Sequence, residues 1–275
     1  MRMPVLFVGH GSPMNAIEDN EWSRGFRSLS ELVPRPRAIL MVSGHWYTNG
    51  TLITGNERPE TIHDFYGFPR ELFAVQYPAP GDVDLARQVR KLIGEERSEL
   101  SNEWGFDHGT WTVLRWMYPQ ADIPVIQLSI NAKLTMAEHL DLAKSLAPLR
   151  DDRVLIMGSG NVTHNLRDLM RQMQTPDFSP PDWALNFDEA VKKAVTTRDR
   201  KSLIDLWPNG PGARQAHPTP DHFLPILYTA AAADHADQVR FQIEGFDRSF
   251  SMRSILYGYT FLNVVAGLAR VINTS

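Results

Sequence analysis

The sequence predicts an α/β fold, a single domain whose central, mostly parallel mixed sheet is flanked by helices on both faces. Short, nearly continuous apolar runs without polar–apolar alternation are typical of strands that are covered on both faces. Segments with apolar residues at helical spacing lie between these runs. The chain of 275 residues shows no convincing boundary, so we expect one domain over residues 1–275.

Eight segments are predicted as strands. The four apolar runs of the buried centre are 5–8, 38–42, 125–129 and 154–157. Four more polar segments, expected at an edge or as antiparallel additions, are 51–54, 73–77, 240–244 and 253–257. Seven segments are predicted as helices, namely 22–32, 83–93, 135–146, 183–196, 200–206, 224–233 and 261–271.

The composition is typical of a soluble globular enzyme, with 43% hydrophobic and 22% charged residues. The net charge is -4 and no basic block of five residues occurs, which argues against nucleic acid as a partner. No apolar stretch approaches the ~18 residues of a membrane span, and the first apolar run is too short for a signal peptide. We therefore expect a cytoplasmic protein without a membrane partner. The absence of cysteine excludes disulfides, thiolate metal sites and cysteine nucleophiles.

Three histidines follow the ends of predicted strands, each near glycine. They are His10 in "VGHGS", His45 in "SGHWY" and His164 in "GSGNVTH". Ligands of open α/β sheets bind outside the carboxyl ends of the strands, so these side chains can converge there. His222 is expected in the first turn of a helix, because Thr219 and Pro220 are favourable cap and first-turn residues.

A cluster of histidines without cysteine suits zinc or ferrous iron, since imidazole is the commonest protein metal ligand. For any one of these histidines, a hydrogen-bonded turn residue is the alternative interpretation. No H-E-x-x-H pattern, P-loop lysine or G-x-S-x-G elbow is present, which argues against common metalloproteases, phosphate loops and serine hydrolases. His108 beside Asp107 is either tuned by the carboxylate or part of a helix cap, and His139 is expected on a solvated helix surface.

Several strings occur in a fixed order between residues 9 and 225: "GHGSPM", "SGHWYT", "TIHDFYGFP", "YPAPG", "DHGTW", "IPVIQLSI", "GSGNVTHNL" and "AHPTPDHFLP". The ordered set resembles the DOPA-type extradiol ring-opening dioxygenases, which belong to the class III extradiol superfamily with the catalytic subunit of protocatechuate 4,5-dioxygenase. Any one string is a weak signal, whereas the ordered set covers nearly the whole chain and is specific.

The resemblance implies one divalent metal ion per chain, held by His10, His45 and His222. It implies that His164 is either a further metal ligand or the acid–base residue, and that His108 is a second catalytic histidine. Fe(II) is implied for catalysis, and Zn(II) can take its place. We expect His222 rather than the adjacent Asp221 as third ligand, because neighbours in a helical turn point about 100° apart. A neutral third ligand predicts a site one charge more positive than the familiar two-histidine, one-carboxylate iron site.

The implied reaction is the cleavage of a catechol by O₂ beside its diol. Family naming suggests L-DOPA, cut at its 4,5 bond to 4,5-seco-DOPA; Arg214 and Arg253 are candidates by charge for binding its carboxylate. Aromatic residues near the histidines either wall a flat pocket or pack in the core: Trp46, Tyr47, Phe65, Tyr66 and Trp183. Two alternatives remain, a zinc-dependent hydrolase using the same cluster and a non-catalytic Memo-like binding protein on the same fold. The expected partners are a small catechol and O₂, with a monomer or homodimer left open.

Overall fold

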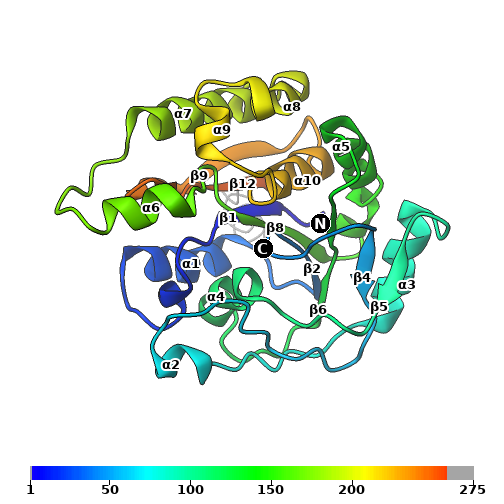
Figure 1. Ribbon diagram of the computed structural model, residues 1–275. Helices are drawn as coiled ribbons and strands as arrows, with labels where there is room; N and C mark the ends of the chain where they lie inside the picture. Colours follow the sequence, from blue (N-terminus) through cyan, green and yellow to red (C-terminus); the bar gives the residue numbers. More distant parts are fainter. Residues whose placement is uncertain (1, 259–275) are drawn as a thin grey trace, which may run out of the picture.

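A six-stranded mixed sheet forms the centre of the computed structural model, which describes residues 2–258 (Figure 1). The strand order is β6-β2-β8-β1-β12-β9. Neighbours among β6, β2, β8 and β1 are parallel, whereas β12 is antiparallel to both β1 and β9. The bounds are β1 Val5–Gly9, β2 Ala38–Ser43, β6 Val125–Gln127, β8 Val154–Gly160, β9 Gln238–Ile243 and β12 Ser254–Gly258. The predicted fold class is confirmed.

The central strands are continuous apolar runs because both of their faces are covered. In β1, Val5 and Phe7 pack into one hydrophobic cluster, while Leu6 and Val8 pack into the other. Successive side chains of a strand point to opposite faces, so a strand between two helical layers needs an apolar residue at every position. Each of these four side chains is fully buried.

Helices cover both faces of the sheet (Figure 1). On one face lie α5 Met136–Lys144, α7 Asp182–Thr196, α8 Arg200–Asn209, α9 Ala213–Ala216 and α10 Leu224–Ala232. On the other lie α1 Glu21–Leu32 and α4 His108–Met117. The remaining helices are α2 Arg70–Phe73, α3 Val83–Ile93 and α6 Leu166–Gln172, with 3-10 turns η1 Pro13–Ala16 and η2 Ala147–Arg150.

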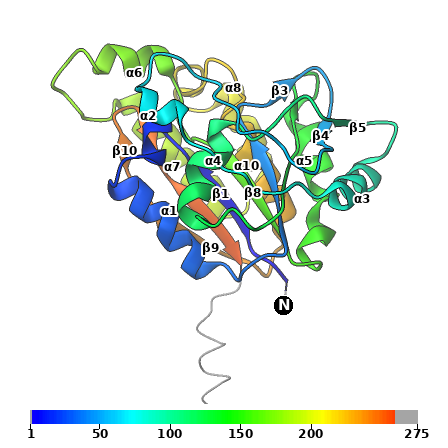
Figure 2. The same ribbon diagram turned by 90° about the horizontal axis from the view of Figure 1, so that it is seen from below.

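Short strand pairs surround the main sheet. They are β3 Tyr47–Thr48 with β7 Ile130–Asn131, β4 Leu52–Thr54 with β5 Glu99–Ser101, and β10 Phe246–Asp247 with β11 Phe250–Ser251. Figure 2 shows the chain between β2 and α4 running along one side of the sheet. Within residues 2–258, no helix has the length and apolar character needed to cross a membrane.

The strand predicted at 73–77 is wrong. Phe73 ends α2, and the next residues are extended with alternating burial but pair with no strand. Side chains satisfy this backbone instead: the Tyr77 N–H donates to Thr61 Oγ1, and the Val75 carbonyl accepts from His63 Nε2. Helices α4 and α6 were not predicted, and the helix predicted at 261–271 lies outside the described residues.

Candidate metal centre

Three predicted histidines meet at the carboxyl ends of the parallel strands. His10 follows β1 directly, His45 lies two residues beyond β2, and His222 lies in the turn before α10. His45 Nε2 is 3.1 Å from His10 Nε2 and 3.2 Å from His222 Nε2. His222 precedes the helix instead of lying in its first turn, because α10 begins only at Leu224. The three rings form one group of potential metal ligands.

The opposite nitrogen of His10 fixes the protonation of its ring. His10 Nδ1 is 2.9 Å from Ser159 Oγ, and that hydroxyl donates its only proton to the Gly109 carbonyl at 2.5 Å. Ser159 Oγ therefore accepts from His10, so Nδ1 carries the hydrogen and Nε2 has a free lone pair. His10 is only 1% exposed, and the arrangement leaves its inward nitrogen ready to bind a cation.

Carboxylates fix the other two rings in the same way. Asp64 Oδ2 lies 3.2 Å from His45 Nδ1, and Asp221 Oδ2 accepts a hydrogen bond from His222 Nδ1. A carboxylate only accepts, so His222 Nδ1 carries a hydrogen, and the nearby Asp64 oxygen favours a hydrogen on His45 Nδ1; in a neutral ring the lone pair is then on Nε2. Three lone pairs thus point at one another with no hydrogen between them, an arrangement that a bound cation relieves. The residues therefore fit a divalent metal such as Zn(II) or Fe(II).

The charges of the cluster agree with this arrangement. Burial, followed by repulsion from neighbouring histidines, holds the pKa of His10, His45 and His164 well below the ordinary value of 6.5. Neutral imidazole is the form that ligates metal. Burial alone would raise the pKa of Asp64 and of Asp221, but hydrogen bonds from His108 and His222 outweigh it and lower both. Both carboxylates are therefore ionised beside the histidine cluster.

His164 and His108 flank the three rings in different ways. The His164 ring stacks on the His222 ring at 3.6 Å with an interplanar angle of 3°, and it belongs to neither of the two groups of potential ligands found among the described residues, which are His10–His45–His222 and His45–Asp64–His108. His108 is the first residue of α4, which Asp107 caps, and its ring lies 3.8 Å from that of His45. Both predicted catalytic histidines therefore border the proposed ligands.

The aromatic residues near the ligands have different surroundings. Phe65 packs edge-to-face on His108 at 5.6 Å. Trp46 is buried and stacks on Trp104, so it is a core residue, whereas Tyr66 is 92% exposed. Among the five aromatic residues predicted near the site, Phe65 is the one for which a ring contact with a site histidine is described.

The two arginines predicted as candidates for binding the substrate carboxylate differ in burial and in their ion pairs. Arg253 is buried and ion-paired with both Asp188 and Glu244, so its charge is already neutralised and the candidate is wrong. Arg214 is exposed on α9. Sequence reasoning also missed Asp64, Ser159 and the contact of Asp221 with its neighbour. The available signal for Asp64 was its place in "TIHDFYGFP", one of the strings that carry the family resemblance.

Close backbone packing holds the His222 segment against the sheet. A Cβ on Gly160, the last residue of β8, would lie 2.2 Å from the His222 carbonyl oxygen. A Cβ on Gly44 would lie 3.1 Å from the Asp221 carbonyl oxygen. The glycines after the strands therefore allow His222 to approach His10 and His45.

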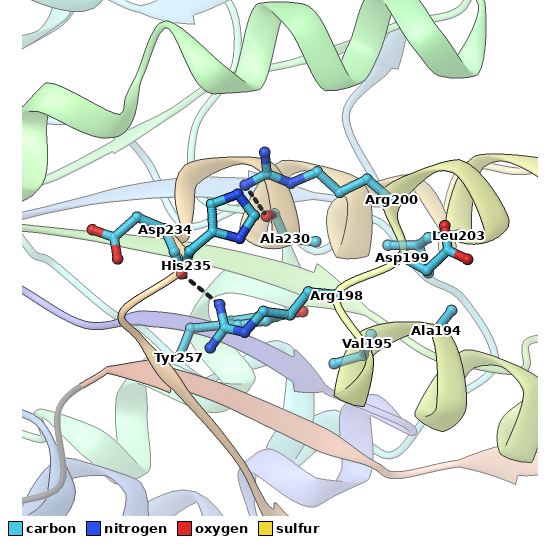
Figure 3. A pocket seen from close by; sticks show the side chains of 10 residues that line it. All are labelled: Ala194, Val195, Arg198, Asp199, Arg200, Leu203, Ala230, Asp234, His235 and Tyr257. Carbon is cyan, nitrogen blue, oxygen red and sulfur yellow. Dashed lines mark hydrogen bonds between the residues drawn. The ribbon is translucent and has the colours of Figure 1, made fainter.

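A small cavity away from the histidine cluster is lined by residues of α7, α8, α10 and β12, among others (Figure 3). It contains Tyr257, which pairs with Val5 at the start of β1, whereas His10 follows the end of that strand. Its volume of about 20 Å³ holds roughly one water molecule. Arg198 and Arg200 in its wall donate to backbone carbonyl groups. This cavity is too small for an aromatic substrate.

Known proteins resemble the chain over most of its length. A family model described as the catalytic LigB subunit of aromatic ring-opening dioxygenase matches residues 4–255. A protein from Escherichia coli K12 named 4,5-DOPA dioxygenase extradiol is 44% identical over 262 residues, covering 94% of this chain and 95% of the relative. A protein of the same name from Beta vulgaris is 37% identical over 237 residues, covering 83% of this chain and 86% of the relative.

The crystal structure of an uncharacterized protein from Escherichia coli K12 has the same fold, with a TM-score of 0.81 and 40% identity. The match covers 94% of this chain and 100% of that chain. Fold and site thus define a metal-dependent ring-cleaving oxidoreductase. The chain belongs to the LigB family of aromatic ring-opening dioxygenases and is an extradiol dioxygenase. The predicted family and enzyme class are confirmed, and neither alternative function is favoured.

Proposed function

We propose that the chain cleaves L-DOPA at its 4,5 bond with O₂, giving 4,5-seco-DOPA, at an Fe(II) centre held by His10, His45 and His222. The observation that carries this proposal is the convergence of three histidine Nε2 atoms at the ends of the strands, with His45 Nε2 3.1 Å from that of His10 and 3.2 Å from that of His222. Relatives named 4,5-DOPA dioxygenase extradiol support the choice of substrate. Zn(II) fits the same three nitrogens but supplies no redox chemistry.

His10, His45 and His222 would hold Fe(II), which would supply the redox chemistry with O₂. His164 is the proposed acid–base residue: burial lowers its pKa and keeps the ring neutral, and a neutral imidazole has a nitrogen lone pair that can accept the second phenolic proton. Its stacking on His222 places it beside a ligand without joining the converging group, which favours the acid–base role over a fourth metal contact. His108 has Nδ1 engaged by Asp64, so its Nε2 is free for the substrate or O₂.

The proposal extends to the whole molecule. The chain acts as one catalytic domain over residues 1–275, in the cytoplasm, as a monomer or homodimer. Its ligands are a small catechol and O₂, without nucleic acid or a membrane as partner. The net charge of -4 and the absence of basic blocks support this choice.

The test is anaerobic loading with Fe(II), followed by L-DOPA and air, with absorbance recording a yellow ring-cleavage product. His10→Ala should lose bound iron, whereas His164→Ala should keep iron and lose about 10²–10⁴-fold in kcat. The matched control is His235→Ala, because His235 is exposed and remote from the cluster in sequence and contacts. Absence of product with L-DOPA and simple catechols, despite one iron per chain, would overturn the proposal.

A further inference from the structure

The carboxylate of Asp64 contacts two site histidines through separate oxygens. Asp64 lies between β4 and α2, and its side chain is 14% exposed. Oδ1 accepts from the backbone N–H of His108 at 2.9 Å and from its Nδ1 at 3.0 Å. Oδ2 lies 3.2 Å from His45 Nδ1. One side chain therefore joins a proposed metal ligand to a proposed catalytic residue.

The other residues that hydrogen-bond to the Nδ1 atoms of the proposed ligands each contact a single ring. In the described contacts, Asp221 accepts from the ring of His222 and Ser159 accepts from the ring of His10. Asp64 is the carboxylate that reaches two rings, and those rings have centroids only 3.8 Å apart. Oδ1 accepts the hydrogen of His108 Nδ1, and Oδ2, 3.2 Å from His45 Nδ1, favours a hydrogen on that nitrogen too; in neutral rings the lone pairs then lie on the two Nε2 atoms.

We propose that Asp64 is a positioning residue that fixes the tautomers of His45 and His108 together, which couples the metal ligand to the substrate-side histidine. The inference rests on the proposed metal centre. It does not require Asp64 to touch metal, substrate or O₂. Loss of both acceptor atoms should weaken metal binding and release the His108 ring, two effects that Asp221 cannot produce together.

Asn at position 64 gives a selective test because an amide has one accepting and one donating end. The backbone N–H of His108 always donates, so the amide oxygen must take the place of Oδ1. The amide NH₂ then faces His45 Nδ1, which must accept. The proton of His45 moves to Nε2, where it blocks the lone pair needed for metal. Asp64→Asn should therefore perturb His45 and spare His108, whereas Asp64→Ala should release both.

The experiment measures Zn(II) affinity by chelator competition and imidazole tautomers by ¹⁵N NMR, in the zinc-free and zinc-loaded chain. Asp64→Asn should weaken Zn(II) binding about 10–100-fold and shift the His45 tautomer while keeping the His108 Nδ1–H signal. Asp64→Ala should change both signals. Asp221→Asn is the matched control and should change the His222 signal with neither of the other two. With saturating Fe(II), Asp64→Ala should also lower kcat through His108.

The inference is overturned if His45 keeps its Nδ1–H in Asp64→Asn, or if the His108 signal is the same in Asp64→Ala and wild type. It is also overturned if Asp221→Asn changes the His108 signal as much as Asp64→Ala does. Should Asp64→Ala fail to fold, Asp64→Asn alone decides through the His45 tautomer. If the variants show the expected tautomers and Zn(II) affinities but the wild-type chain cleaves no catechol, the proposed function is refuted and this inference is still supported.

Discussion

Replacing Gly160 by alanine tests whether backbone packing positions the third histidine. A Cβ on Gly160 would lie 2.2 Å from the carbonyl oxygen of His222 and 3.1 Å from its carbonyl carbon. The φ angle of Gly160 is not positive, so alanine meets no backbone strain beyond this contact. Both partners are backbone atoms, and a rotamer change cannot relieve the clash. The His222 segment must move away from the sheet.

The size of the movement follows from the contact. Real Cβ atoms essentially never come closer than 3.0 Å to such an atom, so His222 must shift by roughly 1 Å. Ligand distances in a metal site are held to about 0.2 Å, and a misplacement of about 1 Å costs roughly 10²-fold in rate. Gly160→Ala should therefore lower kcat/KM for ring cleavage by about 10²-fold and weaken metal binding. Gly44→Ala, with its closest contacts at 3.1 Å, should give a smaller loss.

The assay compares Zn(II) affinity and Fe(II)-dependent ring cleavage in three variants. Gly50→Ala is the matched control, because a Cβ there would meet nothing within 4 Å. The order of loss should be Gly160→Ala, then Gly44→Ala, with Gly50→Ala equal to wild type. A folded Gly160→Ala protein that matches the Gly50→Ala control in both measurements would refute the reasoning. If Gly160→Ala does not fold, the comparison of Gly44→Ala with Gly50→Ala in Zn(II) affinity and ring cleavage tests the reasoning.

Three further predictions follow from buried histidines and their partners. Burial lowers the pKa of His139 to about 4, so its stabilisation is complete above pH 6.5 and disappears as the pH falls to about 4. Urea unfolding should show a loss between pH 6.5 and 4 that is smaller by up to about 3 kcal/mol in His139→Gln than in wild type, since the other buried histidines contribute to both. Ser159→Ala leaves the Nδ1–H of His10 without its acceptor and should cost about 1–3 kcal/mol of unfolding free energy, with weaker Zn(II) binding. Zn(II) at 100 times its Kd should stabilise wild type by about 2.7 kcal/mol, seen as a higher Tm that EDTA reverses and that His10→Ala lacks.

The sequence predicted the parts of the molecule that follow from local periodicity. The buried strands were found because covering both faces requires unbroken apolar runs. His10 and His45 were found because each follows such a run, and parallel strands bring their carboxyl ends to one edge. His222 and His108 depended mainly on the family resemblance, since neither follows a strand. The metal roles of these histidines stay predictions until the chain is loaded.

Partners chosen by tertiary packing could not be predicted. Asp64 meets His108 across 44 residues of sequence, and a single carboxylate in a loop has no period that reveals its partner. His139 was expected in solvent, yet it is 1% exposed and its Nδ1 lies 2.9 Å from the hydroxyl of Tyr228. That helix packs against α10, and the side of a short helix that faces another helix is decided by distant sequence. The expectation for His139 was therefore wrong.

The outer carboxylates change the charge expected of the site. With a neutral third ligand, the metal and its three histidines were expected to have an excess positive charge. That expectation considered only the direct ligands and left out the carboxylates behind them. Asp221 accepts a hydrogen bond from the far nitrogen of His222, and an Asp64 oxygen lies 3.2 Å from the far nitrogen of His45, so two negative charges one ring further out would balance a divalent cation at the proposed site. The cation therefore has little excess charge with which to stabilise a doubly ionised catechol on its own. A neutral base beside the ligands would then accept the second phenolic proton, and the proposed base is His164, whose ring stacks on that of His222.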